Sequence, residues 1–274
     1  SDVDPFTNFG SSIEKNIGDM ENKGIEFQLN LIPVKTDDFE WSLSYNVAFN
    51  DNKITRLPFD QQTGGITGGT GNNVQLHKEG YAPYSFYVYQ QVYNAEGAPI
   101  EGVYVDRNDD GTINDADKYF KGSPYADILM GLNTNINYKK WDLAVVTRAN
   151  IGNYAYNNVA SANSALTSVV PATGDFLSNI HSDYLNSGFV NQTEGNFLSD
   201  YYLQEASFFK VDNITIGYTL DDAVKNTSFR IYGSLQNVAT ITDYDGLDPE
   251  ITGGIDNSFY PRPRTFVLGV NIDF

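Results

Sequence analysis

An acidic segment from Asp106 to Asp117 has the residue types and spacing best suited to chemistry in this chain of 274 residues. Oxygen-bearing side chains stand at positions 1, 3 and 5 of the segment, glycine at position 6 and a carboxylate at position 12. Hard oxygen ligands with this spacing can wrap one Ca2+ ion, with the backbone carbonyl of position 7 as a further ligand. The spacing therefore predicts a structural calcium site with these ligands: Asp106, Asn108, Asp110, Thr112 and Asp117.

A solvated turn without an ion is the alternative for this segment, because aspartate, asparagine and glycine are also the common residues of turns. Position 12 is aspartate, whereas helix-flanked calcium loops have glutamate at this position. Whether the shorter side chain binds the ion through both carboxylate oxygens is left open. The expected role is to neutralise and stiffen a loop. Catalysis by the ion is not expected.

No motif of the chain predicts enzyme activity. The 35 aspartates and glutamates single out no pair as a general acid and base, and no serine lies in a Gly-x-Ser-x-Gly turn. The glycine-rich stretch 64–71 is not followed by Gly-Lys-Ser/Thr, which excludes a phosphate-binding loop of that kind. We therefore expect no catalytic residues.

The composition restricts the class of protein and of partner. A net charge of −18 without a basic cluster argues against nucleic acid and anionic surfaces as partners. The absence of cysteine excludes disulfides and thiolate metal sites. No apolar run reaches eighteen residues, and aromatic residues make up 14% of the chain, of which 19 are tyrosine and 17 phenylalanine. This composition favours β-structure over a helical fold.

Strict alternation of apolar and polar residues is the strongest structural signal. In the last segment, Phe266, Leu268 and Val270 alternate with Val267, Gly269 and Asn271. A strand of this length, tilted by about 45°, would cross a bilayer with its apolar side against lipid. Seven such strands are predicted, over about 22–33, 40–56, 126–138, 141–152, 204–219, a segment containing 229–236, and 264–274.

The connections between these strands alternate between short and long. The long ones, at about 57–125, 153–203 and 241–263, are expected to be extracellular loops, and the short ones periplasmic turns. Within the first long loop, residues 84–93 are expected to form a hairpin outside the membrane. Because single-chain bacterial barrels have an even number of strands, seven strands predict the C-terminal segment of a larger barrel. A soluble β-sandwich is the alternative, since its strands alternate too.

Two further groups of residues are candidates for contact with a ligand or a partner. Polar residues on the inward side of the strands would line the lumen and contact a plug or a solute: Glu26, Gln28, Arg148, Arg230 and Gln236. Aromatic residues of the first long loop could bind a ligand or, as we favour, bury against a partner: Tyr84, Phe86, Tyr87, Tyr89 and Tyr93. The segment Thr242–Glu250, with four acidic residues, could cap a ligand path or contact a partner, but is expected to be a loop fixed by turn residues.

Along its whole length the chain resembles the C-terminal part of SusC/RagA-like TonB-dependent transporters of Bacteroidetes-type outer membranes. The resemblance rests on the order of many short motifs: Asn16–Gly18, Asn22–Glu26, Trp41 with Asn46 and Asn50, Asp106–Asp117, Gly122–Pro124 with Gly131, Tyr202–Leu203, Ala206–Phe208, Asn213–Tyr218, Leu235–Asn237, Thr242–Glu250, and Tyr260–Pro261 with Thr265 and Leu268–Phe274.

This resemblance implies an outer-membrane barrel of 22 strands with a plug inside. It also implies import of oligosaccharides or peptides with energy from TonB, together with a SusD-like surface lipoprotein. The plug and the TonB box are expected to lie outside residues 1–274, which are expected to be barrel only. The alternative function is a surface-binding or adhesion module with a calcium-stiffened loop and no transport role. Neither the residues nor the resemblance indicates which nutrient is imported.

Overall fold

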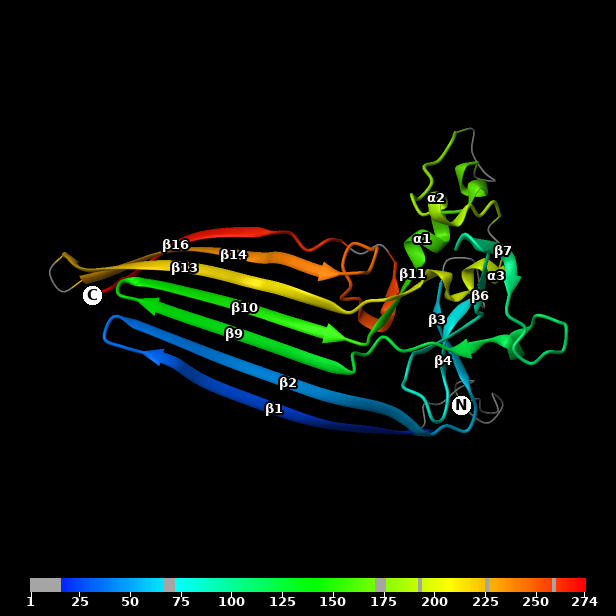
Figure 1. The fold of residues 1–274 in the computed structure, drawn as a ribbon, viewed down its shortest axis with the longest axis horizontal. Coiled ribbons are helices and arrows are strands. Elements are labelled where there is room, and N and C mark those ends of the chain that lie inside the picture. Colours follow the sequence, from blue (N-terminus) through cyan, green and yellow to red (C-terminus); the bar gives the residue numbers. More distant parts are fainter. Residues whose placement is uncertain (1–15, 67–71, 171–175, 192–193, 225–226, 258–259) are drawn as a thin grey trace, which may run out of the picture.

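The computed structural model describes residues 16–66, 72–170, 176–191, 194–224, 227–257 and 260–274 of an all-β chain. Its main element is a sheet of seven antiparallel strands in the order β1-β2-β9-β10-β13-β14-β16 (Figure 1). The strands are β1 (Asp19–Lys35), β2 (Phe39–Arg56), β9 (Ile128–Tyr138), β10 (Trp141–Ile151), β13 (Phe208–Val224), β14 (Thr227–Thr242) and β16 (Thr265–Asp273). All seven predicted strands are confirmed.

The register brings the alternating apolar residues of every strand to one face of the sheet. Because side chains alternate with a period of two, a slip of one residue would move a whole strand's apolar set to the other face. The pairing keeps them together in rows across the sheet, of which one runs Leu31, Leu43, Thr134, Val145, Ile214, Leu235, Phe266. We call this the apolar face.

The apolar face is not covered by the rest of the described chain. Ile25 is 74% exposed, Phe266 75% and Leu268 89%. A soluble β-sandwich would bury these side chains in a core, so that alternative is wrong. Among the described residues, no helix is long and apolar enough to cross a membrane.

The height of the apolar face matches a bilayer. On β9, the apolar face extends from Ile128 to Tyr138, which is the whole strand of 11 residues. At about 3.4 Å per residue and a tilt of about 45°, this strand rises about 26 Å, close to the apolar band of about 25 Å in outer-membrane barrels. Aromatic rings gather at the Tyr138 end, where Trp141 packs on Tyr218 with ring centroids 4.7 Å apart. Such a girdle is typical of a membrane interface.

Short and long connections lie at opposite ends of the sheet (Figure 1). The strand pairs β1–β2, β9–β10 and β13–β14 are joined by short turns at the end where the C-terminus lies. The connections β2–β9, β10–β13 and β14–β16 are long and lie at the other end. The predicted alternation of short and long connections is confirmed, and the assignment of the long ones to the extracellular side stays a prediction.

The long connections fold together into an end module, which we define as the described residues of 57–127, 152–207 and 243–264. Its strands are β3 (Gln61–Gly65), β4 (Asn73–His77), β5 (Ser85–Val88), β6 (Gln91–Tyr93), β7 (Pro99–Tyr104), β8 (Tyr119–Phe120), β11 (Tyr154–Asn157), β12 (Leu203–Glu205) and β15 (Ile255–Asp256). Its α-helices are α1 (Asn158–Asn163), α2 (Tyr184–Ser187) and α3 (Glu194–Phe197). Short 3-10 turns cover Asp115–Asp117, Leu166–Val169, Asp200–Tyr202 and Thr252–Gly254.

The hydrophobic core of the chain lies in the end module and not in the main sheet. Phe86, Tyr156 and Phe189 are almost completely buried in one cluster. Strand β11 of the second connection pairs with β15 of the third, and Tyr89 of the first forms a bridge with Ser199 of the second. The three connections therefore form one packed unit.

Two predictions about this region are wrong in detail. Residues 84–93 do not form a hairpin, because β5 pairs with β4 and β8 whereas β6 pairs with β7. The fifth spanning strand begins at Phe208 and not at 204, since Leu203–Glu205 forms the separate strand β12 beside β11. Ala206, between the two strands, is fully buried against the end module, which explains the break.

Candidate functional site

The face of the main sheet opposite the apolar face is polar, and we call it the polar face. Its rows consist mostly of amide and hydroxyl side chains, as in the row Asn30, Ser44, Asn133, Val146, Asn213, Gln236, Thr265. The alternation places all five predicted lumen residues on this face: Glu26, Gln28, Arg148, Arg230 and Gln236. Whether they line a lumen stays a prediction.

Arg230 does not offer its charge to a solute, because it is paired with Asp142 of β10. Its Nε donates to Asp142 Oδ1 at 2.8 Å and its Nη2 to Asp142 Oδ2 at 2.5 Å. The pair crosses β13 at Gly217, where an added Cβ would lie 2.4 Å from the Asp142 carboxylate. Glycine is therefore required at this position for the two side chains to meet.

Arg148 links the polar face to the connection between β14 and β16. Its guanidinium binds Glu250 bidentately, with N–O distances of 2.5 and 2.8 Å, and its Nε donates to Asp212 at 2.8 Å. Asp212 lies at a register shift of β13, between Val211 and Asn213. Such an irregularity can re-aim a side chain.

Lys210 extends this group of charges. Its side chain is only 2% exposed, and its Nζ lies 2.6 Å from Asp248 Oδ1 and 3.1 Å from Glu250 Oε2. Arg262 donates to Glu250 Oε2 at 2.5 Å. The three cations and three carboxylates have no net charge, and we call them the ion-pair lock: Arg148, Lys210, Asp212, Asp248, Glu250 and Arg262.

The ion-pair lock fixes the β14–β16 connection against the polar face at the end that carries the end module. Thr242–Glu250 is predicted to be a loop fixed by turn residues, and the structure adds that two of its carboxylates are held by cations of β10 and β13. Lys210, Asp248 and Asp142 were not identified from the sequence. Lys210 and Asp248 are 38 residues apart in sequence, and Asp142 and Arg230 are 88 apart, so no local spacing indicates these contacts.

Acid should open the ion-pair lock through Glu250. Hydrogen bonds from Arg148 are the main cause that lowers the pKa of Glu250 from 4.5 to about 2. A carboxyl whose pKa is lower in the folded state stabilises that state above its unfolded pKa, and the stabilisation is lost as the pH falls through the folded value. We therefore expect pepsin to cleave residues 243–257 slowly near pH 4 and rapidly near pH 2.

The control for this experiment is Glu250→Gln, which should be cleaved rapidly at both pH values because the amide cannot pair as an anion. Pepsin activity at each pH is normalised with an unfolded substrate. Equal normalised cleavage of the unsubstituted protein at the two pH values would contradict the role of Glu250.

The predicted loop aromatics have different environments. Phe86 is fully buried in the core of the end module, so its prediction as a contact residue is wrong. Tyr87 donates its hydroxyl to the carbonyl of Asp115 at 3.0 Å, and Tyr89 packs against the same core as Phe86. Tyr84 and Tyr93 are 37% and 47% exposed, and they stay candidates for partner contact.

The Asp106–Asp117 segment winds tightly on itself. Asp106 accepts from the amides of Asp110 and Gly111, and Asp110 accepts from the amide of Thr112. Asp117 is fully buried and accepts from the amides of Arg107 and Asn114, and the bond from Asn114 is the main cause that lowers its pKa. Within the described residues, no three carboxylate or histidine side chains are grouped to hold a metal ion.

Comparison with known proteins decides the family. The chain is 41% identical over 98% of its length to the TonB-dependent receptor SusC of Bacteroides thetaiotaomicron, and 29% identical over 96% to the TonB-dependent receptor P3 of Formosa agariphila. The chain belongs with the SusC-like TonB-dependent receptors. It spans only 28% and 30% of the length of these two relatives. No family model matches it.

Solved structures agree on the fold. The RagAB peptide transporter superposes on 98% of this chain with a TM-score of 0.74 and 20% identity, and this chain covers 31% of that one. A RagAB peptide importer in the open-open state gives a TM-score of 0.72 at 21% identity. The predicted fold, the C-terminal segment of a SusC-like barrel, is confirmed.

Proposed function

We propose that this chain forms part of the wall of an outer-membrane importer for oligosaccharides or peptides. The observation that carries the proposal is the sheet with one apolar and one polar face, in a chain that is 41% identical to SusC. The apolar face contacts acyl chains, and the polar face lines the interior. The end module then lies on the extracellular side.

The partners that follow are the remaining strands and plug of the same receptor, a SusD-like lipoprotein at the extracellular end, and TonB. The name RagAB of the similar solved importers indicates two components, A and B. This supports a partner protein for a receptor of this fold. Arg148 and Arg230 of the polar face are already in ion pairs with Glu250 and Asp142. The interior therefore offers mainly neutral hydrogen-bonding groups. Such a surface suits a folded plug or a neutral solute, and no catalytic role is proposed.

Solute uptake by cells that produce the intact receptor tests this function. We expect labelled oligosaccharide or peptide to reach the periplasm only when TonB is present and to be lost when the receptor gene is deleted. Surface binding without periplasmic delivery, in cells with functional TonB, would favour the adhesion module instead. Native mass spectrometry of the purified receptor should also show a bound lipoprotein.

We also propose that the Asp106–Asp117 segment binds Ca2+ weakly. Its oxygen ligands have the right chemistry, but Asp106, Asp110 and Asp117 would have to give up bonds to backbone amides. A dissociation constant of about 0.1–1 mM, as in extracellular calcium modules, is therefore expected by calorimetry on the intact receptor. Asp110→Asn should weaken binding, whereas Asp60→Asn, outside the segment, should not. Absence of heat at about 10 mM Ca2+ would contradict the site.

A further inference from the structure

A cavity in the end module is lined by residues of the helices α1 and α2 and of the short turn Asp200–Tyr202, in the part of the module that carries both helices (Figure 1). Its polar lining includes these side chains: Asn157, His181, Asp183, Tyr201, Gln204 and Asp245. The cavity has a volume of about 200 Å3, the liquid volume of roughly six or seven water molecules. It can therefore hold one end group of a solute.

One wall of the cavity belongs to the core of the end module. Tyr202 is only 3% exposed, and its hydroxyl lies 3.0 Å from Ser164 Oγ. Asn157 is also buried, and its side chain accepts from the amide of Ala160 at 2.9 Å. Tyr201 packs edge-on against Tyr202 with ring centroids 4.9 Å apart. These side chains are held in place before any ligand enters.

A second wall contains His181 and Asp183, and hydrogen bonds fix it as well. His181 donates its amide to the carbonyl of Asn163 at 2.9 Å, and the amide of Asp183 donates to His181 Nδ1 at 3.2 Å. Tyr201 donates its hydroxyl to Asp183 Oδ1 at 3.0 Å. Burial first, and then the charge of Asp183, raises the pKa of Tyr201, so this phenol stays a hydrogen donor.

The two carboxylates of the lining differ in how they are bound. Gln204 and Asp245 hold each other by two bonds, from Gln204 Nε2 to Asp245 Oδ2 at 3.1 Å and from the amide of Asp245 to Gln204 Oε1 at 2.9 Å. Asp183 Oδ2 is shielded from solvent, and no residue that the structure describes donates to it. Leaving a shielded carboxylate oxygen without a donor is costly, so a ligand that brings hydrogen donors is favoured.

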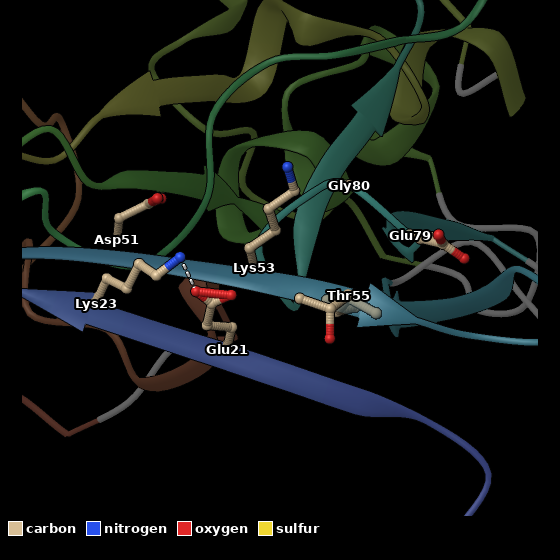
Figure 2. Close-up of a pocket in the computed structure, with 8 residues that line it drawn as sticks. Glu21, Lys23, Asp51, Lys53, Thr55, Glu79 and Gly80 are labelled. Carbon is tan, nitrogen blue, oxygen red and sulfur yellow. Dashed lines mark ion pairs between the residues drawn. The ribbon is translucent and has the colours of Figure 1, made fainter.

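The charge of the lining restricts the ligand further. A larger hollow elsewhere contains Lys23, Lys53 and Glu79, with Lys23 paired to Glu21, so its charges are of both signs (Figure 2). Among the described residues, no lysine or arginine lines the cavity between α1 and α2, and its two carboxylates leave a net charge of −2 with histidine neutral. Nor are these acidic and histidine side chains grouped to hold a metal ion. The lining therefore favours an organic cation and repels an anion.

We propose that this cavity binds a protonated primary amine of a solute, the group carried by the amino terminus of a peptide or by an amino sugar. An ammonium group brings a positive charge and three hydrogen donors, which are what Asp183 and Asp245 lack. The inference rests on the proposed function and deepens it, because the end module would then select solutes at the extracellular end before they enter the barrel.

The test is calorimetric titration of the intact receptor in detergent at pH 7 with two pairs of probes. One pair is trialanine and N-acetyl-trialanine, and the other is glucosamine and N-acetylglucosamine. We expect the free amine of at least one pair to bind about tenfold more tightly than its acetylated form, as expected for one charge-assisted hydrogen bond. The pair with the larger difference identifies the source of the amine.

Two substitutions locate the binding. Asp245→Asn should remove most of the preference for the amine, and because Asp245 is exposed the protein should still fold. Asp183→Asn should have the same effect, with thermal unfolding as the check on its fold. The matched control is Glu79→Gln, which removes a carboxylate from the hollow in Figure 2 and should leave the preference unchanged.

Three results would overturn the inference: equal binding of the free and acetylated forms in both pairs, a preference that both aspartate substitutions leave unchanged, or binding of neutral glucose as tight as that of glucosamine. These failures are separate from failure of the proposed function. A receptor that imports its solute with TonB but shows no preference for amines refutes only the cavity. A receptor that prefers amines but imports nothing refutes only the import.

Discussion

Val145→Arg is expected to destabilise the protein in a bilayer by about 2–4 kcal/mol, the cost of an arginine on the lipid side of a barrel near its midplane. Val145 lies on the apolar face, between Thr134 of β9 and Ile214 of β13, in a central row of the sheet. The measurement is reversible unfolding of the intact receptor in lipid vesicles by guanidinium.

Ala144→Arg is the matched control. Ala144 is the neighbouring residue on the same strand, at nearly the same depth, but it faces Asn135 and Thr215 on the polar face. Arginine can be hydrated there, so we expect a change below about 1 kcal/mol, as for ordinary exposed positions. Equal destabilisation by the two substitutions would contradict the assignment of one face to lipid.

Lys210→Met is expected to lower the free energy of unfolding by about 3–5 kcal/mol, because it leaves buried carboxylates without one of their cations. Lys210 is almost fully buried and contacts both Asp248 and Glu250. Hydrogen exchange of residues 243–257 should become faster at the same time. The faster exchange would show that the ion-pair lock holds this connection on the polar face.

The control for this substitution is Lys139→Met. Lys139 also forms an ion pair, with Asp38 at 3.8 Å, but the two side chains are 56% and 69% exposed. Exposed pairs contribute about 0–1 kcal/mol, so little change is expected. A similarly small effect of Lys210→Met, with unchanged exchange, would show that the connection is held by other contacts.

The strands of the main sheet could be predicted from the sequence because each has one apolar and one polar face. Successive side chains of a strand point to opposite faces, so apolar and polar residues alternate along it. Phe266, Leu268 and Val270 identify their strand without any knowledge of its neighbours. Strand ends were less accurate, as at Phe208, because burial of Ala206 in the end module decides where the strand begins. Nothing in the local pattern indicates that burial.

The end module and the ion-pair lock could not be predicted, since both depend on contacts between distant segments. Strands such as Tyr119–Phe120 and Ile255–Asp256 have two residues, too few to show an alternation. Arg148 was correctly placed on the face opposite the apolar residues, but its partner Glu250 lies 102 residues later. Phe86 has the residue type of a contact residue, and only the fold shows that it is core.

Oxygen accessibility of spin labels along β16 tests the central claim, that one face of this sheet contacts acyl chains, most directly. The chain has no cysteine, so single cysteines can be placed at positions 265–273 without competing labels from this chain. In vesicles containing the intact receptor, labels at 266, 268, 270 and 272 should be accessible to oxygen and shielded from a water-soluble nickel chelate. Labels at 267, 269 and 271 should show the reverse. Uniform accessibility along the strand, or alternation in the opposite phase, would contradict the claim.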